Sequence, residues 1–131
     1  MTLSVAARRC LALGALYGFL CVVLGAFGAH ALREHLTVDR LVIWHTGVEY
    51  QFYHALALLL CGLWLQWQPR RALHVAAICL GIGVPLFSGS LYALVLTDTD
   101  MLGAITPFGG VLFLVAWAAL LWAAVKPLPP G

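Results

Sequence analysis

Apolar residues fill four long runs along the chain, and short polar segments separate these runs. The runs cover about residues 10–29, 48–67, 72–96 and 107–125. Each run holds roughly 20 residues, which is the length at which an α-helix spans a hydrocarbon core about 30 Å thick. The runs are continuous rather than alternating, which favours helices over a β-barrel. The sequence therefore predicts an all-α membrane protein, in which four transmembrane helices form one antiparallel bundle over residues 1–131.

The first run has a second interpretation. Arg8 and Arg9 precede the run, and Gly28-Ala29-His30-Ala31 at its end is similar to the cleavage site of a secretory signal peptide. The apolar core of a signal peptide is about 7–15 residues long, and this run is longer. We therefore expect the run to be a membrane-spanning helix.

The connecting segments differ in length. Gln68-Pro69-Arg70-Arg71 joins the second and third runs, so these two helices must be antiparallel neighbours. The segment from His30 to Gly47 is much longer. Its apolar residues are spaced as on one face of a helix, with charged residues between them, which predicts a short interfacial helix between the first two spans; they are Leu36, Leu41, Trp44 and, just beyond it, Val48.

The distribution of charge predicts the orientation in the membrane. One end of the predicted bundle carries five basic residues and no acidic residue: Arg8, Arg9, Arg70, Arg71 and Lys126. The other end carries two basic and five acidic residues: Arg33, Arg40, Glu34, Asp39, Glu49, Asp98 and Asp100. Because basic loops stay on the cytoplasmic side, both termini are expected in the cytoplasm.

Composition excludes several classes of protein. Hydrophobic residues make up 63% of the chain and charged residues 9%, whereas soluble domains carry about 25% charged residues. The net charge of +2 is small and its carriers are scattered, so we expect membrane lipids and no nucleic acid as partners. The four cysteines have no CxxC spacing and are expected to be free thiols. No metal or cofactor site is predicted from these patterns.

Glycine and proline mark specific places in the helices. Gly14, Gly18, Gly25 and Gly28 share one face of the first helix, and the first two form a small-xxx-small motif that permits close helix packing. We expect the neighbouring helix to belong to the same chain, with a second copy as the alternative. Pro85 lacks a backbone N–H and predicts a kink in the third helix.

Polar side chains gather in the outer half of the predicted bundle, away from the termini. They are His30, Glu49, Tyr50, Gln51, His54, Ser88, Ser90, Tyr92 and Thr106. Polar groups are costly in a membrane and often mark function. Three interpretations remain open: hydrogen bonds that lock the bundle, a metal or haem site using His30 and His54, and a site for a small ligand, a quinone or a lipid headgroup.

Four strings resemble the YgdD/YwdK-type family of small inner-membrane proteins, called domain of unknown function four-two-three. They are GAFGAHAL (residues 25–32), YQFYHALAL (50–58), FSGSLY (87–92) and ITPFGG (105–110), in the same order and spacing. The resemblance implies four spans in a bacterial inner membrane and no established activity. Because these strings lie toward the outer half, they coincide with the polar residues.

Two functional hypotheses follow from the sequence. The first is a non-enzymatic bundle that binds a lipid-soluble ligand or a larger membrane complex through its outer half. The second is a small oligomeric transporter, which would use Glu49, the acidic residue of the polar group. An enzyme is disfavoured, because the chain has no catalytic triad order, paired carboxylates, phosphate loop or zinc spacing.

Overall fold

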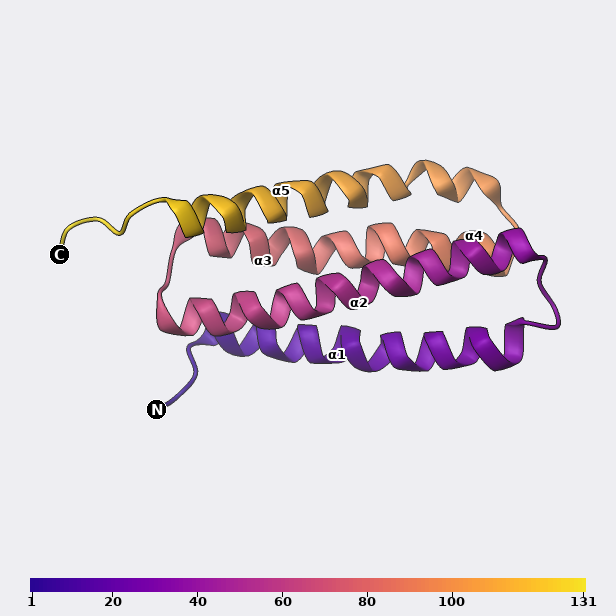
Figure 1. Ribbon diagram of the computed structural model, residues 1–131, viewed down its shortest axis with the longest axis horizontal. Helices are drawn as coiled ribbons and strands as arrows, with labels where there is room; N and C mark the ends of the chain where they lie inside the picture. Colours follow the sequence, from indigo (N-terminus) through magenta and orange to yellow (C-terminus); the bar gives the residue numbers. More distant parts are fainter.

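The computed structural model describes residues 1–131 and contains helices and no strands (Figure 1). Its elements are α1 (Val5–Phe27), η1 (Gly28–Leu32), α2 (Val38–Trp67), α3 (Arg71–Val84), η2 (Pro85–Gly89), α4 (Ser90–Thr97), η3 (Asp100–Ala104) and α5 (Thr106–Val125). They join into four helical segments, each long and apolar enough to cross a membrane. The predicted all-α fold with four spans is confirmed.

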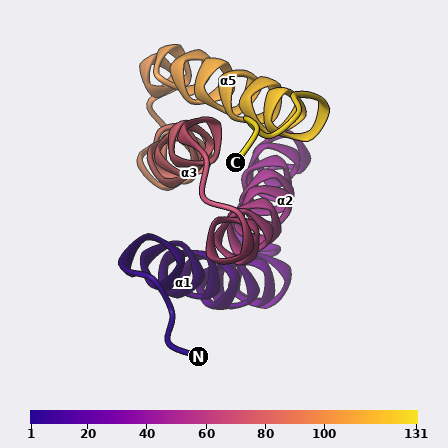
Figure 2. The same ribbon diagram turned by 90° about the vertical axis from the view of Figure 1, so that its left-hand side faces the viewer.

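The four segments pack in chain order. α1 lies against α2, α2 lies against α3 and α4, and α3 lies against α5, so α1 and α5 are at opposite sides of the bundle (Figure 2). Both termini lie at the end that also holds the α2–α3 turn (Figure 1). We call the half of the bundle nearer this end the terminal half. The opposite half, nearer the α1–α2 and α4–α5 connections, is the loop half and is the one predicted to face outward.

The segment predicted as a separate interfacial helix is instead the beginning of α2. It is helical from Val38, where the Thr37 hydroxyl accepts a hydrogen bond from the Arg40 backbone N–H and caps the helix. α2 is 30 residues long, about half again the length that a bilayer requires. No proline interrupts this helix, and near its start Arg40 forms ion pairs with Asp98 and Asp100, at 2.7 and 2.8 Å.

The sequence predicts a kink at Pro85, and the structure has a π-helical turn at this place in the third segment. The α-helical hydrogen bonds stop at Val84 and resume at Ser90, with the wider turn η2 between them. Proline cannot donate a backbone hydrogen bond, and a π turn accommodates the missing bond within a continuous helical path. This turn places Phe87 and Ser88 beside α2 and α5.

Three of the four predicted packing glycines face α2 of the same chain. A Cβ atom at Gly14 would lie 3.1 Å from the Ala55 carbonyl oxygen, and one at Gly28 would overlap the Trp44 indole. Gly25 lies against Val48. Gly18 differs, because a Cβ atom there would meet no atom within 4 Å. The close approach of α1 to α2 therefore depends on positions other than Gly18.

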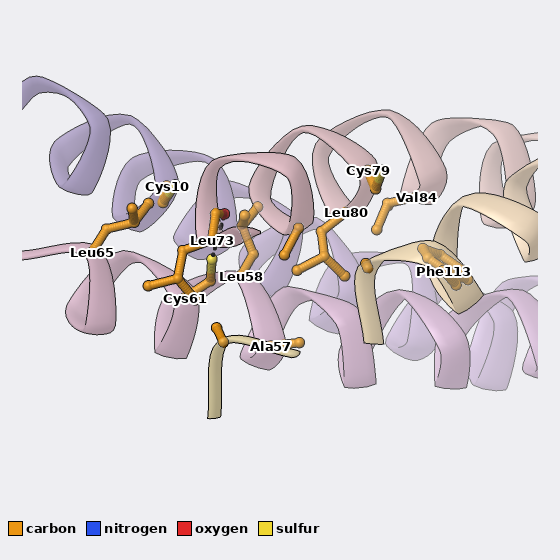
Figure 3. Close-up of a cluster of buried hydrophobic side chains, with 13 residues drawn as sticks. Cys10, Ala57, Leu58, Cys61, Leu65, Leu73, Cys79, Leu80, Val84 and Phe113 are labelled. Atoms are coloured by element: carbon orange, nitrogen blue, oxygen red, sulfur yellow. Dashed lines mark hydrogen bonds between the residues drawn. The ribbon is translucent and has the colours of Figure 1, made fainter. Parts of the chain in front are cut away.

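The terminal half is held mainly by apolar packing (Figure 3). Its central side chains are fully or almost fully buried and come from α2, α3 and α5; they include Leu58, Cys61, Leu65, Leu73, Ala76, Leu80 and Ala116. One hydrogen bond crosses this cluster, from the Cys61 thiol to the Leu73 carbonyl at 3.2 Å. At the membrane surface, the Arg70 guanidinium donates to the carbonyls of Ala123 and Lys126 and so caps the C-terminus of α5.

Candidate functional site

Gln51 connects three helical segments in the loop half. Its side-chain amide donates a hydrogen bond to the Tyr17 carbonyl of α1 at 2.8 Å, and its side-chain oxygen accepts one from the Tyr92 hydroxyl of α4 at 2.7 Å. Gln51 is 3% exposed. A buried polar group is costly unless it is hydrogen-bonded, and here both ends of the amide have partners. Gln51 therefore fixes α1 and α4 on α2.

Other polar side chains of the loop half also donate to backbone carbonyls of neighbouring helices. The fully buried Ser88 hydroxyl donates to Gly47 of α2 at 2.7 Å. The Trp44 indole donates to Leu24 of α1 at 2.9 Å, and the Cys21 thiol donates to Val48 of α2 at 3.1 Å. These contacts are directional, so they set the rotation of each helix about its axis as well as its distance from the next.

Ser90 and Thr106 join α4 to the start of α5. Their hydroxyl oxygens lie 2.6 Å apart, and the Ser90 hydroxyl also lies 2.8 Å from the Phe87 carbonyl of the π turn. The Phe87 carbonyl also accepts a hydrogen bond from the Ser90 backbone N–H, so Ser90 binds this carbonyl through both its backbone and its side chain. These two residues therefore stabilise the interruption that Pro85 introduces.

His54 is buried, and both of its ring nitrogens are in hydrogen bonds. Nδ1 lies 2.6 Å from the Tyr50 carbonyl, and Nε2 accepts from the Trp117 indole of α5 at 3.1 Å. Since a carbonyl can only accept, Nδ1 carries the proton and the ring is neutral. The ring also stacks on Phe113 with centroids 3.5 Å apart. His54 thus holds two aromatic residues of α5 in place.

The residues around His54 form a surface that we call the aromatic face, made of Tyr50, Tyr53, Phe87, Phe113 and Trp117. Tyr50 stacks on Phe87 at 4.6 Å and lies edge-on to Tyr53 at 6.0 Å. Phe113 is buried beneath, whereas Tyr50, Tyr53 and Trp117 are 39%, 53% and 49% exposed. Because the loop half lies within a membrane-spanning bundle, these three rings face the lipid.

The structure leaves two of the predicted residues outside this network. His30 is exposed in the π turn η1 at the end of α1, and Glu49 is exposed on α2. His30 therefore does not meet His54, whose nitrogens are already engaged. No group of three or more His, Cys, Asp or Glu side chains has the geometry to hold a metal ion. The other predicted residues all make contacts between helical segments; they are Tyr50, Gln51, His54, Ser88, Ser90, Tyr92 and Thr106.

Sequence reasoning missed several members of the network. Tyr17 donates from α1 to the Gly81 carbonyl of α3 at 2.6 Å, and Trp44 packs on Tyr92 with centroids 4.7 Å apart. Phe113 and Trp117 were not distinguished from other apolar residues of their helix. One signal in the sequence could have indicated Tyr17: its hydroxyl is a lone polar group in an apolar run. A polar group within a membrane span requires a hydrogen-bond partner.

Comparison with known proteins places the chain among membrane proteins. A family described as "Protein of unknown function (DUF423)" matches residues 24–110. The UPF0382 membrane protein YwdK of Bacillus subtilis is 44% identical over 117 residues, covering 88% of this chain and 95% of YwdK. The UPF0382 inner membrane protein YgdD of Escherichia coli K12 is 40% identical over 121 residues, covering 91% of each chain.

A UPF0382 membrane protein of Staphylococcus epidermidis is 45% identical over 114 residues, covering 87% of this chain and 93% of the relative. No solved structure gives a significant match. The family match includes most of the hydrogen-bonded loop half, from Leu24 to Gly110. Together with four spans, these similarities show that the chain is an integral membrane protein belonging to the DUF423 family.

Proposed function

We propose that this protein is a non-enzymatic membrane bundle that docks, through its aromatic face, onto a transmembrane helix of a larger membrane complex. The observation that carries the proposal is the fixed arrangement of aromatic rings around His54. Two hydrogen bonds and two stacked pairs hold rings from α2, η2 and α5 in one orientation at the lipid boundary. Protein interfaces are enriched in tyrosine, tryptophan and phenylalanine held in this way.

The shape of the face supports a helix rather than a small ligand. Small-molecule sites are concave and enclose most of the ligand surface. Three cavities of the molecule, of about 490, 410 and 210 Å³, are lined by none of the five residues of the aromatic face. Because the rings are already positioned, this protein would lose little side-chain freedom when a partner helix binds.

Photo-crosslinking in living cells tests the proposal. A photoreactive phenylalanine analogue at Tyr53 or Trp117 should crosslink to one and the same membrane protein. The same analogue at Phe19, a residue of α1 that is 67% exposed, should not reach that protein. Combining either probe with Tyr50→Ala should reduce the yield, because the ring that Phe87 stacks on is lost.

The possible outcomes separate the alternatives. One common partner that also co-purifies with the wild-type chain, and not with Tyr53→Ala, supports docking onto a complex. A product of twice the mass of the chain would show instead that the face joins two copies. Crosslinks to lipid alone would show that the face has no protein partner, and the proposal would be wrong.

We also propose that both termini lie in the cytoplasm of a bacterial cell. The basis is the charge difference between the ends: five basic and no acidic residues at the terminal end, against two basic and five acidic residues at the loop end. Alkaline phosphatase is active only outside the cytoplasm. It should be inactive when fused after Gly131 and active when inserted between Asp98 and Asp100, and the reverse pattern would contradict the orientation.

A further inference from the structure

A groove runs between α1 and α3 in the terminal half, on the side of the bundle away from the aromatic face. Its volume is about 490 Å³, within the range of ligand sites. The walls and floor are mainly apolar, with contributions from Cys10, Leu13, Leu58, Leu65, Ile78 and Ile82. Leu58 and Leu65 are 1% and 2% exposed and close the floor, whereas Ile78 and Ile82 are half exposed. The groove therefore opens sideways into the membrane.

The two ends of the groove differ. Toward the middle of the membrane, the Tyr17 hydroxyl donates to the Gly81 carbonyl and ties α1 to α3. At the terminal end, Arg9 of α1 and His74 of α3 line the groove, and both are exposed. This end of the molecule carries five basic residues and no acidic residue, so Arg9 has no carboxylate to pair with. The groove is thus apolar along its length and basic at its mouth.

The length of the groove matches one leaflet. From His74 to Ile82, α3 rises about 12 Å, and one leaflet contributes about half of a hydrocarbon core of roughly 30 Å. We propose that the groove binds one acyl chain of an anionic phospholipid, with the lipid phosphate beside Arg9 and His74. A guanidinium pairs well with phosphate, and basic pockets between transmembrane helices bind anionic headgroups. This site is separate from the aromatic face and does not depend on the docking proposed there.

Lipid retention tests the headgroup contact. The full chain is reconstituted in vesicles of phosphatidylcholine with an equal amount of phosphatidylglycerol, extracted in mild detergent, and measured by native mass spectrometry. The wild type should retain phosphatidylglycerol in preference to phosphatidylcholine. Arg9→Gln should reduce that preference about fivefold, and adding His74→Gln should reduce it further. Arg8→Gln is the matched control, because it removes the same charge one residue away and does not line the groove.

A second pair of variants tests the apolar part of the groove. Ala77→Leu adds a larger side chain to the α3 wall and should reduce the amount of bound phosphatidylglycerol. Ala12→Leu adds the same side chain to an exposed position of α1 and should leave retention unchanged. Circular dichroism during heating should show that all five variants, the Arg9/His74 double variant included, remain folded.

Three results would overturn the proposal. Equal retention of both lipids by the wild type would show that Arg9 and His74 do not select the headgroup. An equal loss in Arg8→Gln and Arg9→Gln would show general attraction to the basic end. Unchanged binding in Ala77→Leu would show that no acyl chain occupies the groove.

Discussion

The loop half and the terminal half of the bundle are held together in different ways. In the loop half, buried polar side chains such as Gln51, Trp44 and Ser88 donate to backbone carbonyls of neighbouring helices. In the terminal half, the helices meet through leucine, alanine and cysteine, and the Cys61 thiol makes the one hydrogen bond within that cluster. The same four helices therefore combine a hydrogen-bonded region with an apolar one.

This difference has a physical origin. Lipid tails are as apolar as leucine, so there is no hydrophobic force between helices inside a membrane. Close packing of small residues can hold the terminal half. Directed hydrogen bonds in the loop half specify rotation, and they position the aromatic face. The groove between α1 and α3 lies in the terminal half.

The largest expected effect is at the closest approach of α5 to η2. A Cβ atom at Gly109 would lie 2.8 Å from the Phe87 Cα atom, and backbone cannot move away as a side chain can. We expect Gly109→Ala to lower the free energy of unfolding by about 3 kcal/mol, at the upper end of overpacking costs. Gly110→Ala is the matched control, because its Cβ atom would lie 3.9 Å from the Phe87 ring. Reversible unfolding in mixed detergent micelles measures both, and equal stability of the two variants would contradict the account.

A second comparison uses two glutamines of α2, one in each half. Gln51→Leu removes two buried hydrogen bonds and leaves the Tyr92 hydroxyl without its partner, so we expect a loss of about 2 kcal/mol. Gln66 also makes two hydrogen bonds, to Ser4 and Thr2, but they are exposed to water. Gln66→Leu should therefore change the free energy of unfolding by less than about 0.5 kcal/mol. A larger loss from Gln66→Leu than from Gln51→Leu would remove the distinction between the halves.

The smallest effect is expected at the exposed ion pairs of Arg40. Arg40→Gln should loosen the first turns of α2 without unfolding the bundle, because surface ion pairs contribute little. Hydrogen exchange of residues 38–47 should become faster in this variant at low salt, and the difference from wild type should shrink in high salt. Arg33→Gln, which removes an exposed charge without an ion pair, should leave this exchange unchanged.

The sequence predicted the larger features of this fold because they depend on the membrane. A run of 20 apolar residues must be a helix in lipid, so the four spans and the tight α2–α3 turn followed directly. The interfacial helix was placed apart from α2 because the pattern from Leu36 to Val48 is amphipathic. That pattern does not show that this segment continues into α2, nor that Arg40 reaches Asp98 and Asp100, which lie far away in the sequence.

The candidate site was less predictable for a related reason. Depth alone grouped the polar residues, and it could not show which way each side chain points. Gln51 and Ser88 point between helices, whereas Glu49 and His30 are exposed. The partners are mostly backbone carbonyls, such as those of Tyr17 and Gly47, and a carbonyl exists at every residue. No sequence pattern therefore marks which carbonyl is used.

A double-mutant cycle between Gln51 and Tyr92 tests most directly whether hydrogen bonds hold the loop half. The free energy of unfolding is measured for Gln51→Leu, Tyr92→Phe, the double variant and the wild type. The account predicts a coupling energy between about 0.6 and 1.7 kcal/mol, as for hydrogen bonds between helices in membranes. Additive effects, with coupling below about 0.3 kcal/mol, would show that these side chains only fill space.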